Sequence, residues 1–301
     1  MLAYLIAFFL LFQPALLPAE CTVSLEFSYS FGGTDEVRVV TASEGELNFI
    51  GQKVEMEYTR EPTKENGLLN WSIKGDGTLE ITYRISSEHY ELKDFRGNLS
   101  DVPERIREKY TGKGYLNIDG ETIKFIDPGN REIRKKALEI AGEEQNTYQI
   151  SRMLYDWITE NIEYNGRAGI YPQSAVETLR KKSGDCDEQT ALFLSLARSL
   201  GVPCFYIDGY IIDGEGKYPA GHAWSGVIRY CDGKEEVFPV DTVCKEFGIK
   251  RANKVFVDFD NGKEGYMDSI YVDLHYWYEK DSKPEIEYEV RCTDFTLDSS
   301  A

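Results

Sequence analysis

One short segment, Ser183–Leu194 (SGDCDEQTALFL), combines residue types that can support nucleophilic chemistry. Asp185 can cap a helix that begins at Cys186, and Glu188 completes a capping box three residues after the cap. The Cys186 thiol then lies in the first helical turn, where the positive end of the helix dipole favours the thiolate. The thiolate is the nucleophilic form, so this position predicts a reactive cysteine. Asp185 and Asp187 act in the opposite direction, and a cationic partner is therefore needed as well.

The chain contains three histidines that could supply this partner, His89, His222 and His275. His89 lies in a β-rich N-terminal part, and His275 lies in the aromatic run LHYWY. We expect both to be structural or surface residues. His222 opens a predicted strand (HAWSGVIRY) and is the best-placed general base.

The third member of the site follows from the geometry of a hairpin. The dipeptide Asp232-Gly233 is typical of a two-residue β-turn. If it forms this turn, Cys231 pairs with Lys234, and Trp224 lies opposite Asp241 further along the two strands.

Residues two apart on a strand point to the same face of the sheet. His222 and Asp241 then become diagonal neighbours, roughly 7–8 Å apart at the backbone. An aspartate in this position can orient the imidazole and stabilise its charged form. The sequence thus predicts a triad of Cys186, His222 and Asp241.

Helices and strands that could position these residues follow one another along the central part of the chain. The pattern predicts helices that start near Asn130, Thr147, Ser174 and Cys186, the last ending at Leu200. Three strands follow, at Cys204–Ile212, His222–Tyr230 and Glu235–Val243. Helices followed by antiparallel strands indicate the α+β class.

The N-terminal part has a different pattern. Residues 22–125 read as short alternating strands, including two strands around Gly75–Gly77. Such a series indicates a β-sandwich-like domain. Asp127–Gly129 marks the change to the helical pattern.

The first residues indicate the compartment. Leu2–Phe12 is an uninterrupted apolar run that fits the core of a signal peptide and is too short for a spanning helix. We therefore expect residues 1–20 to be a signal peptide or an N-terminal anchor, and the protein to be extracellular or at the cell surface. The formal net charge of −18 argues against nucleic-acid binding, and membrane association is expected only through residues 1–20 if they are retained.

Five cysteines remain besides Cys186. In an exported chain we expect some of them to form disulfides. The hairpin register separates Cys231 from Cys244 by about 33 Å along the strand, and a disulfide between these two is disfavoured. The pairing otherwise stays open among Cys21, Cys204, Cys231, Cys244 and Cys292.

In this order and context, the residues resemble the transglutaminase-like superfamily, a papain-like fold. The resemblance covers roughly residues 130–265. It is carried by Ile158–Asn165, Gly184–Cys186, Leu200–Cys204, His222–Trp224 and Pro239–Thr242.

The resemblance implies a papain-like transglutaminase core, with helices packed on an antiparallel sheet, preceded by the β-sandwich-like domain. We expect four regions: the N-terminal segment 1–20, a β-rich domain 22–125, a transglutaminase-like domain 126–265, and C-terminal strands 266–301 packed on the preceding domains.

The function expected from these residues is that of an exported thiol enzyme acting on amide bonds through an acyl-thioenzyme, as a peptidase, deamidase or acyltransferase. Its partner would be a protein, peptide or peptidoglycan-like amide. The backbone N–H of Cys186 and the side chain of Gln173 are candidate oxyanion donors. Asp258–Gly262 contains acidic residues like those of a calcium loop, but the spacing of a helix–loop–helix calcium site is absent. We therefore expect no cofactor or metal.

Two alternatives stay open at this point. The first is a catalytically silent module of the same fold that binds peptides or glycans at the cell surface. The second is a structural exported protein in which Cys186 belongs to a disulfide.

Overall fold

The computed structural model describes residues 19–298, with the exception of 33–35, 119–120, 167–171, 261, 263–275 and 278–284. The predicted signal segment and His275 lie outside the described residues, apart from the last two positions of that segment. Within the described part, no helix is both long enough and apolar enough to cross a membrane.

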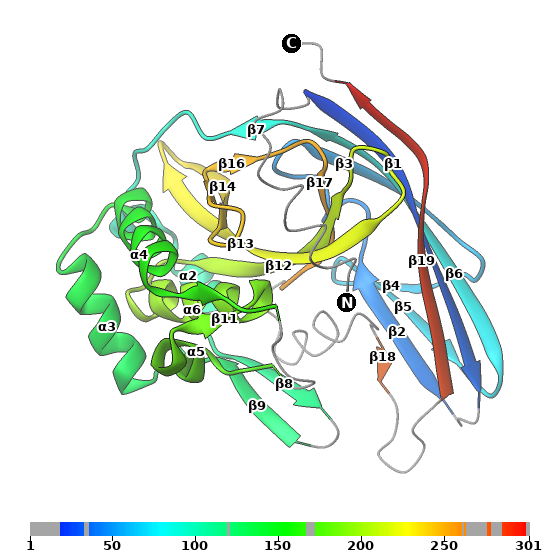
Figure 1. Cartoon of the computed structure of the whole chain (residues 1–301), viewed down its shortest axis with the longest axis horizontal. Coiled ribbons are helices and arrows are strands. Elements are labelled where there is room, and N and C mark those ends of the chain that lie inside the picture. The colour runs from blue at the N-terminus through cyan, green and yellow to red at the C-terminus, as the bar shows by residue number, and fades with distance from the viewer. Residues whose placement is uncertain are drawn as a thin grey trace.

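The N-terminal part forms two four-stranded antiparallel sheets (Figure 1). Their strand orders are β19-β1-β6-β3 and β18-β2-β5-β4. The strands alternate buried and exposed residues, as in β6, where Leu79, Ile81, Tyr83 and Ile85 are buried. The bounds are β1 Glu20–Gly32, β2 Val37–Ala42, β3 Gln52–Tyr58, β4 Thr63–Glu65, β5 Leu68–Ile73, β6 Gly77–Glu88, β18 Tyr276–Trp277 and β19 Glu285–Asp298.

The last strand of the chain returns to the first. β19 pairs antiparallel with β1 from Glu20 opposite Asp298 to Gly32 opposite Glu285. In Figure 1 the blue β1 and the red β19 lie side by side. The N-terminal sheet therefore includes residues from both ends of the described chain.

A short connecting region links this part to the helices. It contains β7 Tyr90–Glu91, η1 Leu99–Asp101, α2 Glu104–Tyr110, β8 Gly114–Ile118 and β9 Glu121–Ile126. β7 pairs with β16 (Ile249–Lys250), and this pairing joins the N-terminal part to the segment that follows the central hairpin.

Four helices follow, as the sequence predicts: α3 Arg131–Ala141, α4 Thr147–Asn161, α5 Ala175–Lys181 and α6 Cys186–Ser199. Asn130 caps α3, and Ser174 with Glu177 forms the capping box of α5. The N-cap of α4 is Asn146 rather than Thr147, because the Asn146 side chain accepts the N–H of Gln149.

The central sheet is antiparallel, with the order β15-β14-β13-β12-β17. Asp232 and Gly233 both have positive φ, and Cys231 pairs with Lys234, which confirms the predicted hairpin. The register continues to Ser225 opposite Val240. The bounds are β12 Cys204–Ile212, β13 Pro219–Cys231, β14 Lys234–Asp241, β15 Glu246–Phe247 and β17 Lys254–Phe259.

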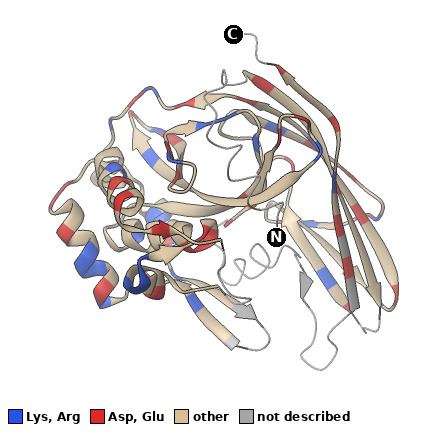
Figure 2. Cartoon of the chain, viewed as in Figure 1, with Lys and Arg blue, Asp and Glu red and all other residues tan. Residues whose placement is uncertain are grey.

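The two faces of the central sheet belong to different hydrophobic clusters. Ala223 and Val227 pack with the helices, and α6 is buried from Glu188 to Ser199. Trp224 and Phe256 instead join the cluster that contains the N-terminal strands. The α+β core and the N-terminal β-structure thus share one sheet as a common wall, and charged residues of both signs are interspersed around them (Figure 2).

Candidate active site

Cys186 lies at the first position of α6, as predicted. The Asp185 carboxylate accepts the backbone N–H groups of Asp187 (3.1 Å) and Glu188 (3.4 Å). The Glu188 carboxylate accepts the N–H of Asp185 at 3.0 Å, which completes the capping box. The parallel pair β10 (Glu163–Tyr164) and β11 (Ser183–Gly184) holds the chain directly before the cap.

His222 and Asp241 are in direct contact, with 2.7 Å between Nε2 and Oδ2. Both side chains are buried. The other carboxylate oxygen, Oδ1, accepts the N–H groups of Val243 (3.0 Å) and Cys244 (2.8 Å). β14 ends at Asp241 rather than at Val243, because the chain turns back there into β15.

Cys186 and His222 interact electrostatically: His222 lowers the pKa of the thiol, and Cys186 raises the pKa of the imidazole. Of the three predicted residues, His222 and Asp241 are therefore in direct contact, and Cys186 at the start of α6 is coupled to His222 through its charge.

Electrostatics favours the charged form of His222. Burial by itself would lower its pKa, but the Asp241 carboxylate, the neighbouring Cys244 and Cys186 raise the pKa well above its ordinary value. Burial would also raise the pKa of Asp241, but Lys254 and His222 hold it far below its usual range.

The surroundings of the Cys186 thiol disfavour its ionisation, whereas the helix dipole alone would favour it. Burial and the Asp187 carboxylate raise the pKa of Cys186 to about 12, although the nearby His222 acts to lower it. Asp187 Oδ1 lies 3.6 Å from the Cys186 sulfur and accepts the Tyr206 hydroxyl at 2.8 Å. Ionisation of Cys186 therefore depends on His222 more than on the helix.

Lys254 and Glu246 complete the surroundings of the aspartate, and the sequence did not indicate either of them. The Lys254 amine lies 2.5 Å from Asp241 Oδ2 and 2.5 Å from Glu246 Oε2. Glu246 also pairs with Arg251 at 2.6 Å. A lysine in an alternating strand is an ordinary feature of a sequence, so no local signal could have identified it.

All six cysteines are unpaired, which contradicts the expectation of disulfides and the alternative with a disulfide at Cys186. Cys204 is buried against the helices, and Cys21 is buried in β1. Cys244, by contrast, lies in the turn after β14, and its sulfur is 3.5 Å from His222 Nε2.

The expectation for Gln173 is wrong. Its side-chain amide donates to Glu188 Oε2 at 3.0 Å and to the Ser183 carbonyl at 3.2 Å. Both contacts fix the segment before the nucleophile, and they occupy the donors that an oxyanion would need. The backbone N–H of Cys186 stays a candidate.

Two groups of described residues have the composition to bind a metal ion: His222 with Asp241 and Cys244, and Asp185 with Cys186 and Asp187. In the first group Lys254 already supplies a cation against Asp241. In the segment Asp258–Gly262, which weakly resembles a calcium loop, Asp260 instead pairs with the buried Arg198 at 2.8 Å. We assign no metal to either group.

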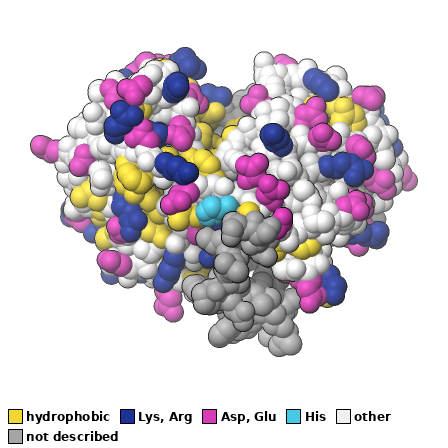
Figure 3. All heavy atoms as spheres, turned by 90° about the horizontal axis from the view of Figure 1, so that it is seen from above, with side chains coloured by type: hydrophobic (Ala, Val, Ile, Leu, Met, Phe, Trp, Pro, Cys, Tyr) yellow, Lys and Arg dark blue, Asp and Glu magenta, His cyan; other side chains and the backbone are white. Residues whose placement is uncertain are grey.

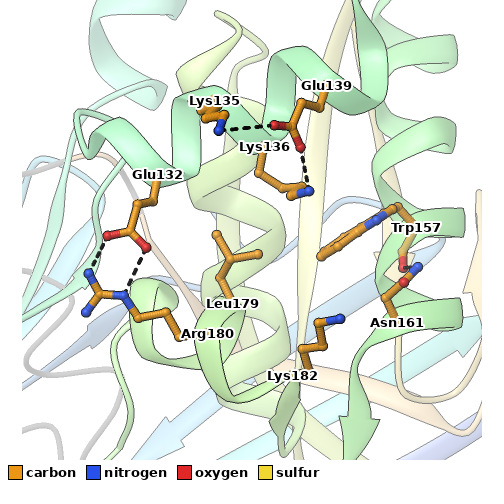
Figure 4. A pocket seen from close by; sticks show the side chains of 9 residues that line it. All are labelled: Glu132, Lys135, Lys136, Glu139, Trp157, Asn161, Leu179, Arg180 and Lys182. Atoms are coloured by element: carbon orange, nitrogen blue, oxygen red, sulfur yellow. Dashed lines mark hydrogen bonds and ion pairs between the residues drawn. The ribbon is translucent and has the colours of Figure 1, made fainter.

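A concave region between α3, α4 and α5 has a volume of about 400 Å³ (Figure 4). Trp157 and several charged side chains line it, but no member of the triad does. Its carboxylates are paired, Glu132 with Arg180 and Glu139 with Lys136. On the face shown in Figure 3, acidic side chains alternate with basic ones without an extended basic patch.

Comparison with known proteins bears on the fold of the segment that carries this site. The family model of the transglutaminase-like superfamily matches residues 134–236, a segment that includes Cys186 and His222. This segment is therefore a transglutaminase-like core, as the sequence resemblance predicts. No curated protein matches the chain.

Solved structures that are similar to this chain include the following two. A candidate cysteine protease from Cytophaga hutchinsonii has a TM-score of 0.60 and 15% identity, with 93% of each chain covered. The periplasmic domain of TgpA from Pseudomonas aeruginosa has a TM-score of 0.41 and 14% identity, over 79% of this chain and 91% of that domain. At these identities, the first comparison establishes a similar fold and nothing about substrates.

Proposed function

We propose that the protein is a thiol-dependent enzyme that cleaves or transfers amide bonds of peptides or proteins, with Cys186 as the nucleophile. The observation that carries the proposal is the direct contact of His222 with Asp241, together with the effect of His222 on the pKa of Cys186. A nucleophile, a base and a group that orients the base are the elements of this class of catalysis.

The chemistry assigns one role to each residue. His222 takes the Cys186 proton, and the sulfur adds to the amide carbonyl carbon to form a tetrahedral intermediate. The intermediate collapses as the C–N bond breaks, and His222 returns the proton to the leaving amine. Water or a second amine then attacks the thioester, which releases an acid or a new amide and regenerates the thiol. Asp241 holds the imidazole in position throughout.

A second candidate is a catalytically silent module of the same fold that binds peptides or glycans. The feature that favours it is the environment of the half-buried Cys186, where burial and Asp187 raise the pKa of the thiol to about 12. In such a module the triad would survive as a structural feature without turnover.

We further propose, from the apolar run Leu2–Phe12, that the protein acts outside the cytoplasm or at the cell surface. Fractionation of the host cells, with mass analysis of the mature N-terminus, tests this proposal separately from the activity. Recovery of an intact N-terminus in the cytoplasmic fraction would refute it.

Mass-mapped alkylation tests the enzyme proposal. Iodoacetamide labelling of the native protein should modify Cys186, and His222→Ala should slow that modification about 100-fold, because general-base assistance contributes at least this much. Cys231 provides an internal control, since its labelling rate should not change. The wild type should also release amines from a library of peptide amides, and Cys186→Ser should not.

The silent module predicts a different pattern. Cys186 would label no faster than a denatured thiol, and the labelling rate would be the same in His222→Ala. No peptide amide would be turned over, although some would still bind.

A further inference from the structure

The catalytic aspartate belongs to a chain of alternating charges, which is buried except for Arg251 at its end, whose side chain is 31% exposed. Asp241 Oδ2 lies 2.7 Å from His222 Nε2 and 2.5 Å from the Lys254 amine. Lys254 also contacts Glu246, which pairs with Arg251. The side chains of Lys254 and Asp241 are only 3% and 2% exposed, so water screens their interaction weakly.

Lys254 is held from several directions. Its backbone carbonyl accepts the amine of Lys250 at 3.3 Å. Two residues further along β17, the Gln52 side chain makes both backbone hydrogen bonds of Phe256, at 2.9 and 3.0 Å. The Lys254 amine also lies 5.6 Å from the centre of the Trp224 ring, which stacks beside His222.

The balance of charge decides what this lysine does to the imidazole. With His222 neutral, Lys254 and Arg251 balance Asp241 and Glu246. A proton on His222 then gives the buried chain a net positive charge, which is costly away from water. Without Lys254, the protonated His222 would instead balance the two carboxylates.

Other groups that face His222 are the same whether or not Lys254 is present. They come from α6, β10 and the turn after β14, and they are Cys186, Asp187, Tyr164 and Cys244. The electric fields of these groups set the pKa that His222 would have without Lys254. Lys254 changes this pKa through its contact with Asp241.

We propose that Lys254 is a positioning residue of the active site, which holds Asp241 and limits how strongly the aspartate retains the proton on His222. The imidazole can then take the proton of Cys186 and give it up again to the leaving amine. This role rests on the proposed function and adds a fourth residue to it.

Titration of His222 tests the proposal without a substrate. The chain has only three histidines, so the His222 ring signals can be assigned by comparison with His222→Ala. Lys254→Met should raise the pKa of His222 by about one unit, the size expected when a charge a few ångströms away is removed. Lys254→Arg keeps the charge and should leave the pKa of His222 close to that of the wild type.

Glu246→Gln provides a second test with the opposite sign. This change removes an anion and leaves Lys254 and Arg251, so the pKa of His222 should fall. It also keeps the proposal testable if Lys254→Met does not fold. The proposal is overturned if folded Lys254→Met or folded Glu246→Gln leaves the pKa of His222 unchanged, or if either moves it in the direction opposite to that predicted.

Activity separates this inference from the proposed function. If peptide amides are turned over, Lys254→Met should lower kcat about tenfold with little change in KM, and Lys254→Arg should restore it. If no amide is turned over but the pKa of His222 moves as predicted, the proposed function fails while the electrostatic role of Lys254 stands. If turnover is present but the pKa does not respond, the inference alone fails.

Discussion

At the scale of single residues, two opposing effects meet at the start of α6. The N-terminal position and His222 favour the Cys186 thiolate, whereas burial and Asp187 disfavour it. Burial also raises the pKa of Asp187 itself, and burial with the nearby Asp187 and Glu188 raises that of Asp185 to about 7. The acidic residues next to the nucleophile are therefore part of what controls its reactivity.

Asp187→Asn should make Cys186 easier to ionise, because it removes the nearest negative charge and still offers Tyr206 an acceptor. We expect the apparent pKa of Cys186, measured by the rate of iodoacetamide labelling against pH, to fall by about one unit. Below that pKa the variant should label faster than the wild type.

The matched control for this prediction is Glu108→Gln, which removes an exposed carboxylate on α2. It should leave the labelling profile of Cys186 unchanged. Equal profiles for Asp187→Asn and the wild type would show that Asp187 does not govern the thiol.

At the scale of elements, the site depends on how closely β17 approaches β12. Gly209 lies opposite His222 in one pairing and opposite Phe256 in the other. A Cβ at Gly209 would come within 2.1 Å of the Val255 carbonyl and 2.6 Å of the Phe256 Cα. Only glycine permits this spacing, which holds β17, the strand that carries Lys254, close to β12, and β12 in turn pairs with the strand that carries His222.

Gly209→Ala should therefore push β17 away from β12. We expect a loss of about 1–3 kcal/mol in the free energy of unfolding, the usual range for overpacking, measured by urea denaturation. Labelling of Cys186 should also change, because Lys254 moves with its strand. Gly214→Ala is the control, since a Cβ at Gly214 meets no atom within 4 Å. If both variants unfold at the same urea concentration, the close approach of β17 to β12 does not govern the stability of the protein.

At the scale of the whole molecule, Lys250 connects the central part to the N-terminal β-structure. Its buried amine donates to the Ser87 hydroxyl at 2.7 Å and to the Glu88 carbonyl at 3.2 Å, both at the end of β6. Burial and the nearby Lys254 lower the pKa of Lys250 to about 7. The contact therefore places a titratable group at the boundary between the two parts of the fold.

This shift predicts a pH dependence of stability with a defined sign. A folded pKa near 7 and an unfolded value near 10.5 mean that the unfolded chain binds more protons between these limits. The contribution of Lys250 to stability should rise with pH across this window and be least favourable below pH about 7.

Lys250→Met should remove that contribution. The Tm of the wild type should therefore rise relative to the Tm of the variant as the pH goes from neutral to alkaline. Lys93→Met replaces an exposed lysine and should follow the wild type at every pH. A constant difference between the wild type and Lys250→Met would exclude a lowered pKa for Lys250.

Much of the site could be predicted because it depends on local rules. The cap at Asp185 and the turn at Asp232-Gly233 involve residues close in sequence, and each has a recognisable residue preference. The hairpin register then placed His222 near Asp241 without knowledge of the remaining fold. The register did not predict the contact of Cys244 with His222, because β14 ends at Asp241 and Cys244 lies in the turn that follows.

The sequence by itself therefore determined the helix that presents Cys186, the hairpin that joins His222 to Asp241, and the resemblance to the transglutaminase-like core. Only the tertiary structure decided that Lys254 and Glu246 surround the aspartate, that burial and Asp187 oppose the thiolate, that Gln173 is occupied, that the six cysteines stay unpaired, and that β19 pairs with β1. The physical reason is that these contacts join segments far apart in sequence. Such contacts depend on which surfaces pack together and how deeply each group is buried, and short-range residue patterns do not encode either.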